Sequence, residues 1–210
     1  MIDIKKFHGD GDIRLWLNQP FVIDGRLIAT DGHKILILKN ADLSGYEELC
    51  KEQNNDYKKY LINMIESHAD FTKYDDIKSS LKWPEKVKCN ICQGIGKAIA
   101  TKCRECDRSG SVDAKTDYST YYDLECATCG GVGYEVNLNT DEICNQCGGA
   151  GLVYEKYSPV EIFGINVQAR YLDLIVSEPG LELGVIKDRN NILIFRVGED
   201  VRGAIMAMIS

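Results

Sequence analysis

The 210-residue sequence lacks the features that mark membrane proteins and several large classes of enzyme. No apolar run approaches the ~20 residues that a membrane-spanning helix needs. There is no phosphate-binding P-loop, no Gly-x-Ser-x-Gly nucleophile turn and no His-Glu-x-x-His motif of zinc proteases. Histidine is scarce as well, because only three occur and none has the spacing of metal ligands. We therefore expect a non-enzymatic protein that does not bind membranes.

Basic residues are too few for strong nonspecific binding to nucleic acid. Lys and Arg number 25 against 32 Asp and Glu, a formal net charge of −7, whereas a surface that binds nucleic acid is normally basic. One local basic cluster could still contact phosphate: Lys97, Lys102, Arg104 and Arg108. The alternative is that these side chains form a solvated rim.

The N-terminal segment 1–7 is polar and charged, so it does not resemble a secretory signal. We expect an intracellular, cytoplasmic protein, in a compartment where thiols stay reduced. The apolar fraction of 44% is ordinary for a globular protein, and the length suffices for one domain plus a small one.

Cysteine, in contrast, is abundant and regularly spaced. Eight of the nine cysteines form four Cys-x-x-Cys pairs, each followed by glycine: Cys89/Cys92, Cys103/Cys106, Cys126/Cys129 and Cys144/Cys147. Two thiolates with two residues between them can chelate one ion from a tight turn, and glycine lets the backbone fold beneath the metal. Four pairs therefore predict two closed, all-cysteine sites that hold two Zn²⁺ ions. The ninth cysteine, Cys50, is then a buried or partly exposed thiol.

Two other uses of these cysteines fit the sequence less well. A disulfide framework would need an oxidising compartment, which the polar N-terminal segment does not suggest. Thioredoxin-like redox chemistry uses a single Cys-x-x-Cys at the start of a helix, not four repeats flanked by glycine. The zinc interpretation is favoured over both.

The repeated Cys-x-x-Cys-x-Gly-x-Gly pattern over residues 89–151 resembles the cysteine-rich domain of DnaJ-type chaperones (J-proteins). Three repeats match fully, and the second carries Arg108 where the first glycine is expected. The resemblance implies that the outer repeats, with Cys89, Cys92, Cys144 and Cys147, share one zinc. It implies that the inner repeats, with Cys103, Cys106, Cys126 and Cys129, share the other. The His-Pro-Asp tripeptide of J-domains is absent, so the chain is not a complete J-protein.

Pairing of the first repeat with the fourth would also bring the two ends of this segment together, as an insertion into another domain requires. The flanking segments have strand character on both sides. Asp24-Gly25 and Asp31-Gly32 predict hairpins that join three strands over 21–38. We therefore expect an α+β domain formed by residues 1–84 and 155–210, interrupted by a zinc-binding insertion of β-hairpins at 85–154.

Four further segments carry structural predictions. An apolar stripe over 57–68 predicts a helix packed on one face. Residues 168–177 are expected to form a short helix, and 201–209 a final strand. Segment 1–18 is expected to be a short helix or an irregular lead-in, with four side chains available for burial: Ile13, Leu15, Trp16 and Leu17.

An aromatic hairpin is predicted between the second and third repeats, at 113–123. It contains Tyr118, Tyr121 and Tyr122. These side chains could form a contact surface for a partner, or they could cover the zinc turns, and the sequence does not distinguish the two.

The flanking domain resembles one domain of a bacterial sliding clamp, the β subunit of DNA polymerase III. The resemblance rests on Ala-Thr-Asp-Gly-His-Lys-Ile at 29–35 and on Ala-Ile-Met-Ala-Met at 204–208. In clamps, the corresponding elements line a hydrophobic pocket that captures peptide motifs of partner proteins. The resemblance implies that this pocket contains Thr30, Gly32, His33, Ile35 and Met206. Because a clamp builds the pocket from two neighbouring domains, we expect an intact pocket to need two subunits of this chain, in a homo-oligomer.

Three functions follow as hypotheses. The first is a zinc-stabilised interaction protein that binds a protein partner in DNA replication, repair or their regulation; the unusual fusion suggests a phage or mobile-element origin. The second is a chaperone-like module that binds unfolded polypeptides through the zinc domain. The third is a nucleic-acid-binding protein that uses the basic cluster.

Overall fold

The computed structural model describes residues 2–49, 56–187 and 191–208. The chain divides into two compact units, which we call the body (Met1–Pro84 and Lys156–Ser210) and the zinc unit (Glu85–Glu155). The boundary predicted after residue 154 lies one residue later in the structure. Cys50 lies outside the described residues. No helix in the described part of the chain is long and apolar enough to cross a membrane.

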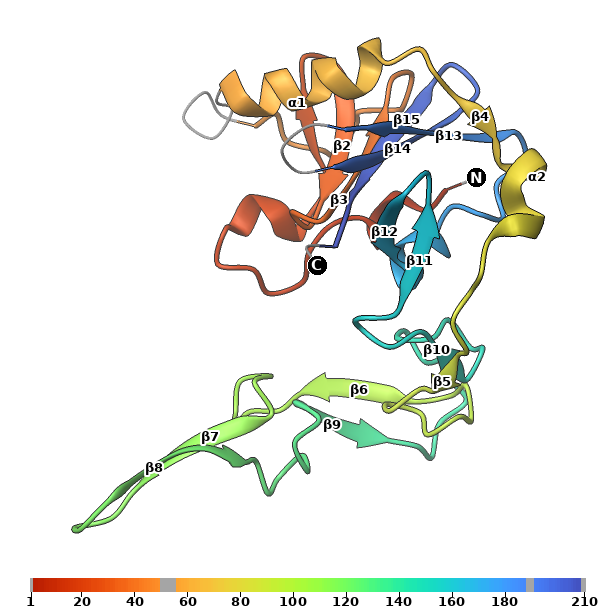
Figure 1. The fold of residues 1–210 in the computed structure, drawn as a ribbon. Coiled ribbons are helices and arrows are strands. Elements are labelled where there is room, and N and C mark those ends of the chain that lie inside the picture. The colour runs from red at the N-terminus through yellow and green to blue at the C-terminus, as the bar shows by residue number, and fades with distance from the viewer. Residues whose placement is uncertain (1, 50–55, 188–190, 209–210) are drawn as a thin grey trace. The chain divides into compact units, whose positions relative to one another are not determined.

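The body is built on one antiparallel sheet of seven strands (Figure 1). Its strand order is β1 (Phe21–Ile23), β2 (Arg26–Thr30), β3 (Lys34–Leu38), β15 (Val201–Met206), β14 (Ile192–Val197), β13 (Leu181–Ile186) and β4 (Thr72–Lys73). The three strands predicted over 21–38 are β1 to β3. Strand β15, near the C-terminal end, pairs with β3, with Ala204 opposite Ile35. The two sequence segments on either side of the zinc unit therefore share one sheet.

Helix α1 (Asp56–Ser67) lies across one face of this sheet (Figure 1). It forms where the sequence places an apolar stripe, and it buries Ile62 and Ile65 against Ile28, Ile37 and Ile194. Such burial contributes roughly 1.5–3 kcal/mol for each large aliphatic side chain. The helix is thus held mainly by the sheet beneath it.

The remaining elements of the body are short. They are η1 (Ile4–Lys6), η2 (Leu15–Asn18), α2 (Tyr74–Ile77), η3 (Lys78–Ser80), the hairpin β11 (Pro159–Ile162) with β12 (Ile165–Gln168), and α3 (Ala169–Leu172). The helix expected over 168–177 ends early, because the backbone N–H of Ile175 turns back to the carbonyl of Leu172 and tightens the chain into successive turns. The final strand ends at Met206 rather than at residue 209.

The N-terminal segment corrects one expectation. Of the four apolar side chains expected to be available for burial, Leu17 is fully buried and Trp16 partly so, but Ile13 and Leu15 remain 94% and 78% exposed. The loop before η2 turns these two side chains outward, since Asp12 accepts hydrogen bonds from the backbone and guanidinium of Arg14.

The zinc unit contains three antiparallel ladders of two strands each. They are β5 (Val87–Lys88) with β10 (Leu152–Val153), β6 (Ile99–Lys102) with β9 (Tyr134–Asn137), and β7 (Ser111–Lys115) with β8 (Thr120–Glu125). The pairs are nested, so the first strand pairs with the last and the innermost pair is a hairpin. The mostly β structure with few helices is consistent with the α+β class.

Candidate metal centres and candidate binding pocket

The eight cysteines of the four repeats gather into two clusters of four. In each cluster all sulfur atoms lie within 4.8 Å of one another; the clusters are Cys89, Cys92, Cys144 and Cys147, and Cys103, Cys106, Cys126 and Cys129. These groupings are the ones that the DnaJ resemblance implies, outer repeat with outer and inner with inner. The cysteines are free thiols, so the structure does not support a disulfide framework.

The spacing of the sulfur atoms fits tetrahedral zinc. Four of the Sγ–Sγ distances are 3.9 Å (Cys89–Cys144), 3.6 Å (Cys92–Cys147), 3.8 Å (Cys103–Cys126) and 3.6 Å (Cys106–Cys129). A tetrahedron with Zn–S bonds of about 2.3 Å has edges of about 3.8 Å, whereas a disulfide bond is about 2.05 Å long. The donor set and its geometry are therefore compatible with two zinc ions, each closed by four thiolates.

The turn that follows each pair directs backbone N–H groups at the sulfur atoms. The amides of Gly96, Gly133 and Gly151 each donate to a cysteine Sγ at 3.2 Å. Such donors stabilise a thiolate and orient it toward a metal. Arrangements of this kind recur in structural zinc sites because the turn both positions the ligand and lowers its proton affinity.

Burial and hydrogen bonds from these amides shift the pKa of the cysteine thiols in opposite directions. Burial raises the pKa of the Cys92 thiol, but hydrogen bonds from Gly96 and Gly94 outweigh it and lower the pKa to about 7. Burial raises the pKa of Cys89 to about 12 in the same cluster. Holding four thiolates together therefore requires a positive charge among them, which a divalent cation supplies.

Paired repeats are also packed backbone against backbone. A Cβ atom added at Gly110 would lie 2.2 Å from the carbonyl oxygen of Gly131, and one added at Gly133 would lie 2.4 Å from that of Arg108. The outer repeats show the same contact, between Gly96 and Gly149 and between Gly151 and Gly94. The second glycine of each repeat is thus needed for close approach to the partner repeat.

The first glycine of each repeat makes no such close approach to backbone. This explains why Arg108 can replace it in the second repeat. Arg108 has a positive φ of 76°, and the glycines at the equivalent positions also have positive φ. A Cβ atom added at Gly94, Gly131 or Gly149 would meet only side-chain atoms. The Arg108 guanidinium lies 5.1 Å from the ring centroid of Tyr134, and its Nε donates to the Tyr134 hydroxyl at 3.1 Å. The cost of the positive φ, ~1–2 kcal/mol, is offset by these contacts.

The predicted basic cluster is largely engaged within the zinc unit. Lys97 pairs with Asp141 at 2.7 Å, Lys102 pairs with Asp107, and Arg108 is held by Tyr134 as described. Arg104 is exposed. Three of the four side chains therefore have partners within the zinc unit, and a contact of this cluster with phosphate stays a prediction.

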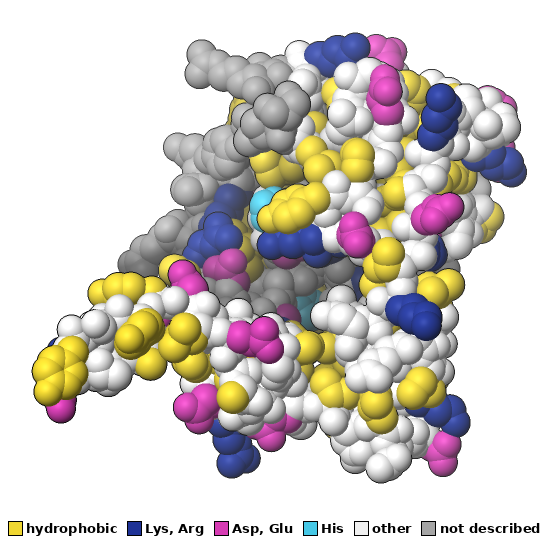
Figure 2. Space-filling view, turned by 60° about the horizontal axis from the view of Figure 1, so that its bottom comes forward, with side chains coloured by type: hydrophobic (Ala, Val, Ile, Leu, Met, Phe, Trp, Pro, Cys, Tyr) yellow, Lys and Arg dark blue, Asp and Glu magenta, His cyan; other side chains and the backbone are white. Residues whose placement is uncertain are grey.

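The aromatic hairpin β7–β8 presents its tyrosines to solvent (Figure 2). Tyr118 is 96% exposed, Tyr122 70% and Tyr121 51%. The hairpin side chain that packs against the inner cysteine cluster is instead Val112. The tyrosines therefore do not cover the zinc turns, and the contact-surface alternative is the one that the geometry favours.

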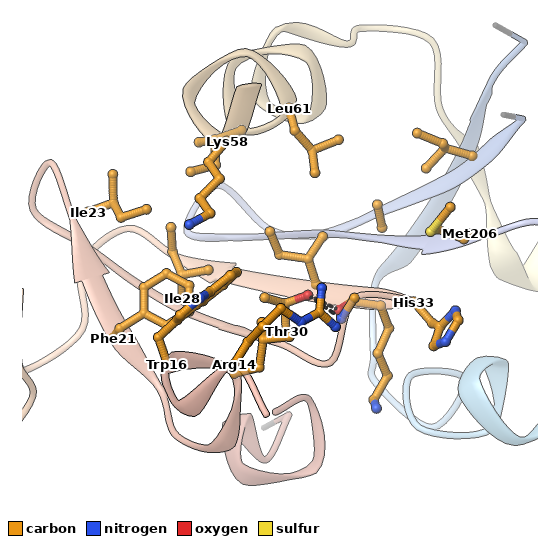
Figure 3. Close-up of a pocket in the computed structure, with 17 residues that line it drawn as sticks. Arg14, Trp16, Phe21, Ile23, Ile28, Thr30, His33, Lys58, Leu61 and Met206 are labelled. Atoms are coloured by element: carbon orange, nitrogen blue, oxygen red, sulfur yellow. Dashed lines mark hydrogen bonds between the residues drawn. The ribbon is translucent and has the colours of Figure 1, made fainter. Parts of the chain in front are cut away.

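The body contains a cavity of about 290 Å³ between the sheet and α1, and all five residues implied by the clamp resemblance line it (Figure 3). They are Thr30, Gly32, His33, Ile35 and Met206. We call this cavity the body pocket. It forms within a single chain, because β15 pairs with β3 and the Met206 amide donates to the His33 carbonyl at 2.8 Å. The five residues thus lie together in one chain, and the expected homo-oligomer stays a prediction.

Several lining residues were not anticipated from the sequence, among them Arg14, Trp16 and Lys58. Trp16 packs edge-to-face on Phe21, with ring centroids 5.5 Å apart, and the Lys58 Nζ lies 3.7 Å from the Trp16 ring centroid. No motif marks them: Arg14 and Trp16 lie in the segment before β1, and Lys58 lies on α1.

Beside His33, the buried side chain of Lys34 forms an ion pair with Asp31 and lies 4.8 Å from the ring centroid of Tyr171. Burial lowers the pKa of Lys34, and the Asp31 carboxylate partly offsets the effect. Asp31 also accepts hydrogen bonds from the backbone amides of His33 and Lys34, so the loop that carries His33 is held in place.

Comparison with known proteins supports the DnaJ resemblance of the zinc unit but not the clamp resemblance of the body. No family model matches the chain. The chaperone protein DnaJ of Wolbachia sp. subsp. Brugia malayi (strain TRS) is 33% identical over 81 residues, which cover 37% of this chain and 20% of that protein. This similarity and the two cysteine clusters fit a DnaJ-type zinc domain. No solved structure matches, so the clamp resemblance of the body has no structural support from comparison.

Proposed function

We propose that this chain is a non-enzymatic, zinc-binding interaction protein whose body pocket binds a peptide segment of a partner protein. The observation that carries the proposal is that five residues from the end of β2, the β2–β3 loop, β3 and the end of β15 line one cavity in one chain: Thr30, Gly32, His33, Ile35 and Met206. These residues come from segments about 170 positions apart in the sequence.

The chemistry of the body pocket suits a peptide. Aliphatic side chains and a thioether form an adaptable surface for apolar side chains of a partner. Met206 is 37% exposed, whereas Ile35 is buried, so the pocket has both an accessible wall and a fixed floor. The resemblance to sliding clamps is the reason to propose partners in DNA replication, repair or their regulation.

The zinc ions have a structural role in this proposal. A site closed by four thiolates leaves no position for a water or substrate, so it stabilises a fold rather than activating a reactant. Metal binding at such sites supplies folding free energy. The zinc unit would then present the β7–β8 hairpin as a second surface.

The pocket is tested by selecting peptides from a phage-displayed library of random heptapeptides against the zinc-loaded full chain. We expect selected peptides to bind the unmodified chain and to lose most of their affinity for Met206→Glu, which places a charge on the pocket wall. Val136→Glu is the matched control, because Val136 has the same 37% exposure but lies in the zinc unit. Equal binding to Met206→Glu, or no selected peptide at all, would overturn the proposal.

A second function has its own supporting observation. The exposed Tyr118, Tyr121 and Tyr122 form an aromatic surface on a unit similar to part of a DnaJ chaperone, which suggests binding of unfolded polypeptides. The test is suppression of aggregation of chemically denatured citrate synthase. Tyr122→Ser should weaken suppression, while Tyr157→Ser, a body residue of nearly equal exposure, should not. If both variants still suppressed aggregation, the β7–β8 hairpin would be excluded as the surface that binds unfolded polypeptides.

A further inference from the structure

The β7–β8 hairpin exposes large apolar side chains along its second strand and its turn. Tyr118 is 96% exposed, Tyr122 70%, Tyr121 51% and Leu124 41%. Large apolar side chains exposed together are typical of contact surfaces for proteins, in which tyrosine is enriched. We infer that this hairpin binds a segment of a partner protein that is rich in arginine. The inference does not depend on the body pocket, and it names a partner other than an unfolded chain.

The strand register divides the hairpin into two faces. Residues directly opposite each other in an antiparallel pair share a face, so Tyr121 lies with Ala114 and Leu124 with Val112. Val112 packs against the inner cysteine cluster. The first face is therefore the apolar one, and it continues onto the zinc turns.

The second face carries charge, because a β-bulge adds a residue to it. The regular pairing is interrupted in β8, where Tyr122 and Asp123 stand opposite the single residue Asp113. Asp123 has a φ of 53°, and its amide donates to the Asp113 carboxylate at 3.1 Å, which holds the bulge in place. Glu125, opposite Ser111, lies on the same face. The exposed ring of Tyr122 thus shares its face with three carboxylates.

The charge of the hairpin selects the partner. Residues 111–125 contain four carboxylates and one lysine, a formal net charge of −3. Within the described part of the chain no ion pair engages these carboxylates, and all four are exposed: Asp113, Asp117, Asp123 and Glu125. Such a surface attracts a cationic segment, whereas it repels nucleic acid and a second copy of the same hairpin. The charges therefore complement a basic protein segment.

Rings and carboxylates on one surface favour arginine in that segment. A guanidinium can stack on an aromatic face and donate two parallel hydrogen bonds to a carboxylate, whereas the ammonium of lysine offers no planar face. The zinc unit already contains a contact of this kind, between the Arg108 guanidinium and the Tyr134 ring. A purely apolar segment would instead bury carboxylates without partners, which is costly.

Chemical-shift titration of the zinc-loaded, ¹⁵N-labelled full chain measures the binding and locates it. The probes are four Gly-Ser peptides of equal length that carry Arg, Lys, Gln or Leu at the same three positions. We expect the Arg peptide to bind most tightly, the Lys peptide less tightly, and the Gln and Leu peptides most weakly. The Arg peptide should shift the amide resonances of residues 111–125, and its affinity should fall as the salt concentration rises.

Two triple variants form a matched pair. The hairpin variant removes three carboxylates with little change of shape: Asp113→Asn, Asp123→Asn and Glu125→Gln. The control variant removes the same formal charge from exposed carboxylates elsewhere in the zinc unit: Glu135→Gln, Glu142→Gln and Glu155→Gln. The hairpin variant should weaken binding of the Arg peptide roughly tenfold. The control should weaken it by no more than about twofold, because salt screens distant charges.

The aromatic contribution has its own variants. Tyr122→Leu keeps an apolar side chain but removes the ring, so the advantage of the Arg peptide over the Lys peptide should shrink about two- to fivefold. Tyr122→Phe should keep that advantage. Unchanged zinc content and melting temperature would show that each variant is folded.

Several results would overturn the inference. Equal affinity for the Arg and Gln peptides would do so, as would resonance shifts that lie only outside residues 111–125. Equal weakening by the two triple variants would reduce the binding to a general attraction toward an acidic chain. If the Leu peptide bound as tightly as the Arg peptide, the hairpin would be a surface for unfolded chains instead. None of these results bears on the body pocket, which the Met206→Glu variant tests separately.

Discussion

Substitution of Gly110 by Ala provides the sharpest test of how the zinc unit is built. The structure places the carbonyl oxygen of Gly131 2.2 Å from the position of the new Cβ atom, and the φ of Gly110 is +79°. Alanine in this conformation costs ~1–2 kcal/mol, and forcing the backbone of the paired repeat to move costs a further ~1–3 kcal/mol. We therefore expect the inner cluster to lose about 2–5 kcal/mol of stability in the zinc-bound form.

Because the zinc-bound turn and the fold form together, this loss appears as weaker metal binding. A factor of ten in affinity corresponds to ~1.4 kcal/mol, so Gly110→Ala should weaken one zinc site roughly 30-fold or more. Competition with a chromophoric chelator, such as 4-(2-pyridylazo)resorcinol, measures the two ions separately as two phases. The outer cluster, with Cys89, should keep its affinity.

Two control substitutions isolate the steric contribution. Gly130 also has a positive φ, of +57°, but a Cβ added there meets nothing within 4 Å, so Gly130→Ala should lose only the ~1–2 kcal/mol of backbone strain. Arg108→Gly relieves strain but removes the contact with Tyr134, and it should change zinc affinity little. If Gly130→Ala weakened the inner site as much as Gly110→Ala, the argument from close packing would be refuted.

Three other predictions concern the removal of zinc, the cysteine ligands and an ion pair of the body. Chelation of zinc should unfold residues 85–155 while the sheet of the body stays folded, as amide hydrogen exchange would show; protection lost equally in both units would contradict this. Cys89→Ser and Cys103→Ser should each release a different ion, so the double variant should release both. If the two single variants emptied the same site, the pairing of outer with outer and inner with inner repeats would be wrong. A hydrogen bond from Arg196 lowers the pKa of Glu182 below its ordinary value. This ion pair therefore stabilises the body at pH values above the ordinary glutamate pKa, and the stabilisation is lost as the pH falls through the lower pKa of the folded state. Glu182→Gln should therefore reduce the fall in melting temperature that occurs as the pH is lowered. An unchanged fall in melting temperature would show that this ion pair is not its cause.

The sequence indicated the cysteine clusters well because their chemistry is local. Each Cys-x-x-Cys pair already contains half of a site, and the DnaJ resemblance supplied the pairing that brings Cys89 to Cys144 in the structure. The requirement for glycine could also be anticipated, but its cause could not. That cause is the approach of Gly110 to Gly131, a contact between repeats that no spacing within one repeat describes.

Other parts of the fold depended on tertiary contacts and were predicted less well. Ile13 and Leu15 were expected to be available for burial because they are apolar, yet hydrogen bonds from Arg14 to Asp12 hold their loop with both side chains outward. The helix expected to reach residue 177 ends at Leu172, where tighter turns replace it. In both cases local hydrogen bonding outweighed an apolar pattern.

The body pocket shows how an insertion can leave a cavity of the flanking domain intact. Its two walls come from β3 and β15, which lie on opposite sides of the zinc unit in the sequence yet pair directly, with Ala204 opposite Ile35. The zinc unit enters and leaves through β5 and β10, and Val87 pairs with Val153 at that point. Because the two ends of the insertion are paired with each other, the ordering of residues 85–155 by metal need not strain the sheet that forms the pocket. It follows that the loss of zinc and the loss of peptide binding should be separable, and a peptide affinity that falls in step with zinc occupancy would show that this separation is wrong.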